Sequence, residues 1–448
     1  MVSFCNRGGK NMSTRTMVWA VVVALVIGTG LPVLAGDLED AKKEFKEAIG
    51  IQDYSAAGRA FSTAAREDDG KAAKWIIQNG AKKQKFELYD GAKNALLTMK
   101  SDDAIEAMCS KARKGSFEEK MLLAEVFRGM SDKKTAQALT QMVLDKKPEV
   151  VREAAISLSE RGIRDGVDNL IEAMETYEKI KGRTYDEIRR ALVGLVGGGA
   201  DLTSAADWRN YWDIKKAEKD AEPVTSGPKV DEDGGVMKDG GPHTVSDNPK
   251  FFGTEVASKR ILFILDGSGS MQASASDPRQ RGRPGQPLAD ARINVTKAEL
   301  KNCIQGLKKT AKFDIIVYNN VVKVWAGKLA SAKGAAKKSA AKFIDEWDAN
   351  QVTHTDDAVE KAFSSKGYKD VDTIFLLSDG CPTHSGRNDD TPQLIAEILS
   401  YVKDKNATRK IKIFTFGFLS PNPQGPDILA QFMKDLAEQN GGKFKALP

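Results

Sequence analysis

Residues 260–271 read Arg-Ile-Leu-Phe-Ile-Leu-Asp-Gly-Ser-Gly-Ser-Met, and this stretch decides the fold of the carboxyl-terminal half. Its unbroken apolar run predicts a β-strand that is buried on both faces. The strand ends on Asp266, and Ser268 and Ser270 follow at alternate positions. The glycines between them let the backbone turn tightly enough to aim one carboxylate and two hydroxyls inward. The stretch therefore predicts part of a binding site for a hard cation.

Two downstream segments carry further oxygen ligands. Residues 352–359 read Val-Thr-His-Thr-Asp-Asp-Ala-Val and contain Thr353. Residues 372–380 read Asp-Thr-Ile-Phe-Leu-Leu-Ser-Asp-Gly and form a second buried-strand pattern that ends on Asp379. Ligands of open α/β sheets bind outside the carboxyl ends of the strands. We therefore expect Asp266 and Asp379 to converge although they are far apart in the sequence.

On these segments the chain resembles the von Willebrand factor type A (VWA) family over about residues 255–448. The metal-ion-dependent adhesion site (MIDAS) of that family combines a D-x-S-x-S motif with a distant Thr and a distant Asp. The five matching positions are Asp266, Ser268, Ser270, Thr353 and Asp379. The resemblance implies that the hydroxyls act directly or nearly so on the ion and that the carboxylates contact it largely through water. It also implies an open coordination position for an Asp or Glu carboxylate of a partner protein, flanked by Thr355 and Asp356.

The ligand types indicate which cation the site would hold. Oxygen ligands alone favour Mg²⁺, Mn²⁺ or Ca²⁺ over zinc, which prefers His and Cys. His354 and His384 are close to the motif segments in sequence. We interpret both as loop residues beside the site rather than as ligands.

The segment 273–287 is longer than this fold needs after its first strand. It carries Arg279, Arg281 and Arg283, which bring positive charge toward the metal face. One hypothesis is that this loop helps to select an acidic partner. The alternative is a disordered insertion.

The carboxyl-terminal half, residues 253–448, alternates strand and helix patterns, which predicts a doubly wound, mostly parallel sheet with helices on both faces. The expected strands are 260–266, 312–318, 321–326, 371–378, 411–418 and 443–447. The expected helices are 290–309, 332–347, 355–365, 391–404 and 427–440. Asn319 and Asn320 favour a tight hairpin, so 321–326 is expected to be the one antiparallel strand, at the sheet edge.

Residues 36–215 are rich in Ala, Lys, Glu and Leu at helical spacing, which predicts an all-α domain. The expected helices are 38–50, 53–67, 70–80, 85–99, 101–114, 117–130, 132–145, 149–161, 165–180 and 184–197. Residues 151–158 recur in similar form at 188–195, a displacement that is typical of two-helix repeats. This favours a HEAT-like solenoid, with an irregular helical bundle as the alternative. Trp208, Tyr211 and Trp212 are expected to cap its open end.

The remaining segments are predicted to direct export of the protein and to connect its two domains. Residues 1–35 combine Arg and Lys with an apolar stretch and the small residues of a cleavage site, which predicts a signal peptide and export to the periplasm, the cell surface or the medium. An uncleaved membrane anchor is the alternative. Residues 216–252 are rich in Gly, Pro, Asp and Lys and predict a flexible linker. Cys109, Cys303 and Cys381 are interpreted as buried thiols, with a bridge between the last two left open.

Composition and motifs limit the function classes. The chain has 448 residues and a net charge of +6, which gives little electrostatic support for nucleic-acid binding. The sequence has only three histidines and lacks a Walker loop, a G-x-S-x-G elbow and an H-E-x-x-H motif. The leading hypothesis is an exported, non-enzymatic module that binds a partner protein, with no small-molecule substrate and with the helical domain as scaffold or second surface. The alternatives are a metal-dependent hydrolase or phosphotransferase and a structural protein that the metal only stabilises.

Overall fold

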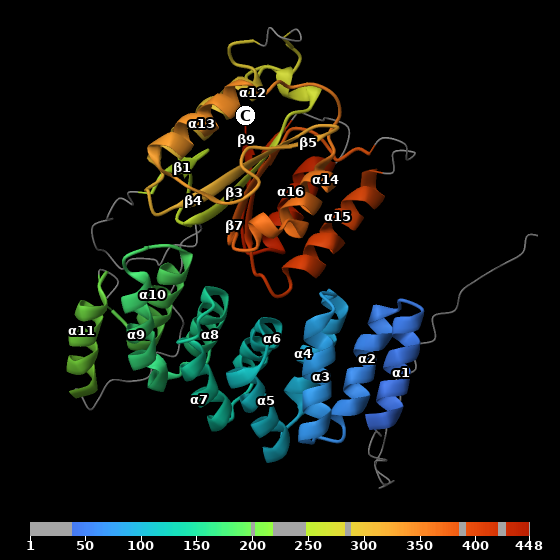
Figure 1. The fold of residues 1–448 in the computed structure, drawn as a ribbon, viewed down its shortest axis with the longest axis vertical. Coiled ribbons are helices and arrows are strands. Elements are labelled where there is room, and N and C mark those ends of the chain that lie inside the picture. Colours follow the sequence, from blue (N-terminus) through green and yellow to red (C-terminus); the bar gives the residue numbers. More distant parts are fainter. Residues whose placement is uncertain are drawn as a thin grey trace, which may run out of the picture. The chain divides into compact units, whose positions relative to one another are not determined.

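The computed structural model describes residues 38–198, 202–217, 248–282, 288–384, 391–419 and 427–447. The described residues between 38 and 217 form helices and their connections, and those between 248 and 447 form an α/β domain (Figure 1). The predicted signal peptide and most of the predicted linker lie outside the described residues. Within the described ranges, no helix combines the length and the apolar character that a membrane span requires.

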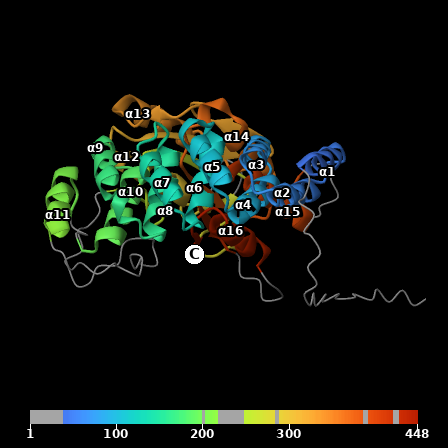
Figure 2. The ribbon, with the colours of Figure 1, turned by 90° about the horizontal axis from the view of Figure 1, so that it is seen from below.

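The helical domain contains eleven α-helices among its described residues, and they follow one another in chain order (Figures 1 and 2). Their bounds are α1 Leu38–Gly50, α2 Tyr54–Ala65, α3 Gly70–Lys82, α4 Phe86–Thr98, α5 Asp102–Lys114, α6 Phe117–Arg128, α7 Lys133–Met142, α8 Pro148–Glu160, α9 Val167–Tyr177, α10 Arg183–Val196 and α11 Ala205–Ala217. All ten expected helices are present within a few residues. One buried apolar cluster runs through the domain, as in a solenoid.

The repeated sequences lie on α8 and α10, which pack against each other. Pro148 starts α8, where its missing N–H costs no helical hydrogen bond. The last helix, α11, was not among the expected helices. It packs on α9, and its Trp208 is fully buried, which agrees with a cap at the end of the helical row.

The α/β domain contains a seven-stranded sheet in the order β5-β4-β3-β7-β8-β9, with β6 also paired to β4. The strand bounds are β3 Arg260–Asp266, β4 Lys312–Tyr318, β5 Val322–Val324, β6 Ala330–Ser331, β7 Thr373–Ser378, β8 Lys412–Phe418 and β9 Phe444–Leu447. All pairings are parallel except those of β5 and β6 with β4. The expectation of a single antiparallel strand is therefore wrong. The two-residue β6 is too short to leave an alternating pattern in the sequence.

Helices cover both faces of this sheet (Figure 1). Helices α12 (Arg292–Gly306) and α13 (Gly334–Asp345) pack on one face with alternate residues of β3, such as Phe263. Helices α14 (Thr355–Ser364), α15 (Thr391–Asn406) and α16 (Ile428–Glu438) pack on the other face with Ile264 and its neighbours. This doubly wound arrangement confirms the predicted fold class.

Ordered structure of the α/β domain begins inside the range assigned to the linker. Residues Lys250–Phe251 form β1, which pairs with β2, Thr254–Glu255. The Phe251 ring is fully buried and lies 5.1 Å from the ring of Phe416 and 5.5 Å from that of Phe263. The segment rich in Gly, Pro, Asp and Lys ends before Phe251 and Phe252. Phe251 therefore belongs to the core of the domain and not to the linker.

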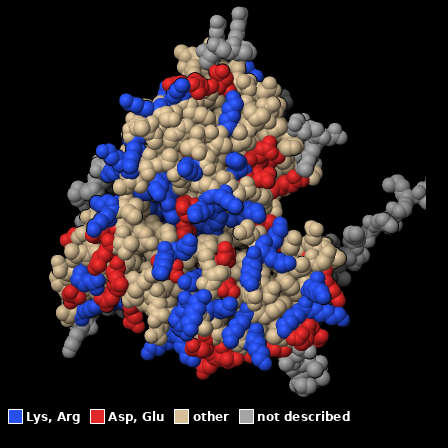
Figure 3. Space-filling view, in the orientation of Figure 1, with Lys and Arg blue, Asp and Glu red and all other residues tan. Residues whose placement is uncertain are grey.

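One further sequence expectation, a bridge between two cysteines, is resolved by the fold. Cys303 and Cys381 are both free, and they adjoin the apolar layers on opposite faces of the sheet, so no bridge joins them. On the face in Figure 3, Lys and Arg side chains are spread over the surface with Asp and Glu among them.

Candidate metal site at the carboxyl edge of the sheet

Asp266 and Asp379 meet because their strands are neighbours in the sheet. β3 and β7 are parallel, and Leu265 pairs with Leu377, so both strands end at the same edge. Ser378 Oγ donates a hydrogen bond of 2.5 Å to Asp266 Oδ2, and the backbone N–H of Asp379 lies 3.4 Å from the same oxygen. The predicted convergence of the two carboxylates is therefore present.

The turn after β3 joins its serines to both carboxylates. The backbone N–H of Ser268 donates to Asp266 Oδ1 at 2.7 Å. The hydroxyls of Ser268 and Ser270 lie 2.9 Å apart, and Ser270 Oγ donates to Asp379 Oδ1 at 2.6 Å. One chain of hydrogen bonds thus connects four of the five predicted ligands.

Thr353, the fifth predicted ligand, comes from the segment that leads into α14. A Cβ built on Gly380 would lie 3.4 Å from Thr353 Oγ1 and 3.8 Å from Ser270 Oγ, so both hydroxyls border the same glycine. A backbone hydrogen bond joins this segment to the serine turn, which is the turn after β3 that carries Ser268 and Ser270. The Gly269 N–H donates to Gln351 O at 2.9 Å. Three segments remote in sequence therefore bring their oxygen atoms to one edge.

The electrostatics of this cluster favour a cation. Asp266 is fully buried and Asp379 is 7 % exposed. Burial, reinforced by the charge of Asp379, raises the pKa of Asp266 to about 7. Burial also raises the pKa of Asp379, while hydrogen bonds from Ser270 and Arg292 oppose that rise. Two carboxylates in one buried place repel each other, and a divalent cation would relieve that repulsion.

Arg292 is a residue of this site that the sequence did not reveal. It begins α12, is 3 % exposed, and its Nη1 donates to Asp379 Oδ2 at 2.8 Å. Its position in the sequence does give a signal, because Arg292 is the first residue of a helix, where the helix dipole disfavours a cation. An Arg at that position suggests a buried anionic partner.

The donor set fits a hard cation. Two carboxylates and three hydroxyls supply oxygen atoms only, as Mg²⁺, Mn²⁺ and Ca²⁺ prefer. The cluster also matches the residues that the resemblance assigned. The five residues that would hold the ion are Asp266, Ser268, Ser270, Thr353 and Asp379.

The described part of the loop 273–287 is held in place. Residues Ala273 and Ser274 form bridges with Arg281 and Ala291. The Ser274 hydroxyl donates to Asp290 Oδ2 at 2.5 Å. The charge of Arg281 is among those that lower the pKa of Asp379, so this loop does bring positive charge toward the site. Arg283 lies outside the described residues.

Comparison with known proteins identifies the class of the carboxyl-terminal domain. A family model described as the von Willebrand factor type A domain matches residues 288–445. These residues are therefore a VWA domain, as the motifs indicated. The match begins after the D-x-S-x-S motif, so it contains Thr353 and Asp379 but not the serine turn.

Curated relatives align with part of the chain. The inter-alpha-trypsin inhibitor heavy chain H2 of Homo sapiens is 25 % identical over 193 residues, which are 41 % of this chain and 17 % of the relative. The same protein of Mus musculus is 24 % identical with the same coverage. The alignment thus spans about a sixth of the length of these relatives.

Solved structures are similar to part of the chain. A von Willebrand factor type A protein from Catenulispora acidiphila has 19 % identity and a TM-score of 0.31, covering 43 % of this chain and 40 % of its own. The PilB minor pilin from Streptococcus sanguinis has 14 % identity and a TM-score of 0.33, covering 44 % and 58 %.

Proposed function

We propose that the chain is an exported, non-enzymatic protein-binding module that captures an Asp or Glu carboxylate of a partner protein through a divalent cation. The observation that supports this most is the cluster of five oxygen-bearing residues at the carboxyl edge of the sheet. Mg²⁺ is the expected ion, with Mn²⁺ and Ca²⁺ as alternatives. A bound ion of this kind would supply an electrophilic position for an outside oxygen ligand.

The residues of the site have different roles in the proposed binding of a cation. Asp266 and Asp379 supply the negative charge, and the hydroxyls of Ser268, Ser270 and Thr353 supply neutral ligands. Arg292 already offsets the charge of Asp379 at 2.8 Å. Because the resemblance implies that the carboxylates contact the ion largely through water, its direct protein ligands would be neutral hydroxyls, which leaves the ion electrophilic toward an anionic partner group. Arg281 at the edge of the site favours an acidic partner for the same reason.

The helical domain is proposed as a scaffold or a second binding surface, since stacked helices present extended surfaces for proteins. Export is proposed from the sequence of residues 1–35.

Affinity capture with the purified chain tests the proposal. The chain is immobilised and exposed to an extract in which it naturally occurs, once with Mg²⁺ and once with EDTA, and the partners are identified by mass spectrometry. A specific partner is expected with Mg²⁺ alone and is expected to be lost in Asp266→Ala. The matched control Asp370→Ala changes an exposed carboxylate that precedes β7, at the end of that strand opposite to Asp379, and is expected to keep the partner. A partner that survives both EDTA and Asp266→Ala would contradict the proposal and favour a metal that only stabilises the fold.

A further inference from the structure

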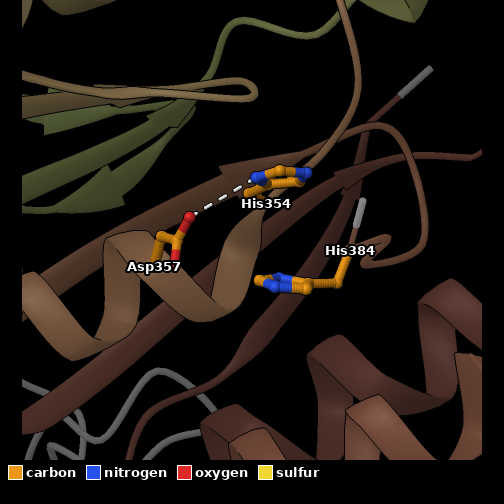
Figure 4. A group of neighbouring side chains, drawn as sticks. All are labelled: His354, Asp357 and His384. Carbon is orange, nitrogen blue, oxygen red and sulfur yellow. Dashed lines mark ion pairs between the residues drawn. The ribbon is translucent and has the colours of Figure 1, made fainter. Parts of the chain in front are cut away.

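Figure 4 shows a second group of ligand-type side chains, which come from the chain segments that follow Thr353 and Asp379. His354 immediately precedes α14, Asp357 lies in the first turn of that helix, and His384 follows β7. The imidazole rings of the two histidines are stacked, with their centroids 5.1 Å apart and an angle of 28° between them. One possible ligand atom from each of the three residues lies within 4.8 Å of the others. One nitrogen atom from each histidine and one carboxylate oxygen therefore lie close together.

The protein backbone holds the two histidine-bearing segments together. Thr383 N–H donates to Thr353 O at 2.9 Å, and Thr353 N–H donates to Thr383 Oγ1 at 3.2 Å. His354 N–H donates to Asn319 O at 3.0 Å, which ties the segment to the sheet. The juxtaposition of the histidines is thus fixed by neighbouring hydrogen bonds and does not depend on the rings alone.

We propose that His354, Asp357 and His384 form a second cation site, which takes a transition metal of intermediate softness such as Zn²⁺. Imidazole and carboxylate are common zinc ligands, and three protein ligands with a fourth position open is a known zinc arrangement. This site differs in chemistry from the oxygen-only cluster, so the two sites select different ions. The inference extends beyond the proposed function and does not depend on it.

The distances are close to those that a bound ion requires. Zinc bonds to nitrogen or oxygen are about 2.1 Å long, so two ligand atoms of one tetrahedral ion are about 3.4 Å apart. His354 Nδ1 and Asp357 Oδ2 are already 3.4 Å apart, and all three ligand atoms lie within 4.8 Å of one another, so the side chains must close by at most about 1.4 Å. The side chain of His354 is 5 % exposed and would act as the fixed ligand. Those of His384 and Asp357 are 34 % and 42 % exposed and have room to move.

Asp356 completes the surroundings of the site. Its Oδ2 lies 2.8 Å from His384 Nδ1. A carboxylate in that position orients a metal-binding imidazole. Asp356 is therefore a positioning residue, and the partial exposure of the His384 and Asp357 side chains leaves room for water or a partner group beside the ion.

Metal titration of the full chain, prepared without a polyhistidine tag, tests this inference. The protein is stripped of metal, saturated with Mg²⁺ to fill the oxygen cluster, and titrated with Zn²⁺ by calorimetry and with Co²⁺ by visible spectroscopy. We expect one equivalent of each metal to bind and Co²⁺ to show the intense absorption of a low-coordinate site with nitrogen ligands. His384→Ala is expected to weaken binding at least about tenfold and to remove that absorption.

Two controls separate this site from others. His243→Ala changes the third histidine of the chain and is expected to bind like the wild type. Asp266→Ala removes a residue of the oxygen cluster and is also expected to keep Zn²⁺ binding, so failure of the proposed function would not affect this result. His384 is partly exposed, so its replacement should leave the fold intact, which circular dichroism checks. Unchanged Zn²⁺ binding in His384→Ala, or no binding by the wild type, would overturn the inference.

Discussion

At the scale of single residues, the two buried carboxylates make metal binding dependent on pH. The pKa of Asp266 is raised to about 7, far above the ordinary value of about 3.9 for an aspartate. Between these two values the native chain binds more protons than the unfolded chain. Without metal, this group's contribution to stability is therefore largest below about pH 4 and falls as the pH rises toward 7.

A cation must displace the proton from Asp266 when it binds. We predict that the apparent affinity for Mg²⁺ falls about tenfold for each pH unit below about 7, the slope expected for one displaced proton. Calorimetric titrations between pH 5.5 and 8 measure this slope. In Asp266→Asn, binding should be much weaker and its pH dependence reduced. Equal affinity across this range in the wild type would contradict the assignment of Asp266.

Arg292 provides a second prediction at this scale. Its replacement by Met keeps much of the side-chain volume but leaves the Asp379 carboxylate buried without its cationic partner. We expect Arg292→Met to lower the free energy of unfolding by about 3–5 kcal/mol in EDTA, the typical cost of breaking a buried ion pair. Mg²⁺ should restore part of this loss and should bind more tightly than in the wild type.

Urea denaturation with EDTA and with Mg²⁺ measures both effects. Arg279→Met is the matched control, because its side chain is 96 % exposed and 3.9 Å from its nearest acidic partner. That variant should unfold like the wild type. Equal losses for Arg292→Met with and without Mg²⁺ would show that Arg292 supports the fold but not the charge of the metal cluster.

At the scale of elements, the turn after β3 has no space for an additional side chain. A Cβ at Gly267 would lie 2.6 Å from Trp347 Nε1 and 3.2 Å from Tyr318 O. We predict that Gly267→Ala destabilises the domain by about 1–3 kcal/mol through overpacking and weakens Mg²⁺ binding, since the serines that follow must shift.

A glycine elsewhere provides the control. Gly334 starts α13, and a Cβ there would have nothing within 4 Å. Gly334→Ala should therefore leave stability unchanged or slightly higher, because Ala favours helix. Thermal denaturation and Mg²⁺ titration of the two variants provide the comparison. Equal behaviour of both would mean that the turn can adjust without moving its hydroxyls.

Helices and strands with a sustained apolar pattern are the elements whose bounds can be predicted from the sequence. The long helices and the strands β3, β4, β7 and β8 were predicted within a few residues because each has a sustained apolar period. The three-residue β5 was placed correctly by the hairpin at Asn319, whose Oδ1 accepts from Val321 N–H at 3.0 Å. β6 and the β1–β2 hairpin were missed, because two-residue strands carry no period.

At the scale of the whole molecule, metal binding should affect the two domains differently. We predict that Mg²⁺ slows amide hydrogen exchange in the segments around residues 266–271, 351–356 and 379–383. Helices α1 to α11 should be unaffected, because none of the five proposed ligands belongs to them. Hydrogen exchange followed by mass spectrometry measures both regions in one experiment.

The same measurement on Asp266→Ala is the control, and it should show no effect of Mg²⁺ in either region. Slower exchange in the helical domain of the wild type would show that the ion influences both domains. The absence of any effect on the sheet edge would contradict the metal site itself.

The sequence by itself determined the α/β class and the helical domain, and it predicted the set of five candidate oxygen ligands. Each of these depends on a local pattern, either an apolar period or a fixed spacing after a strand. Only the tertiary structure revealed Arg292 against Asp379, the stacked His354 and His384, and Phe251 in the core. These contacts join residues from segments that are remote in the chain. They therefore form only when the sheet and its loops pack together.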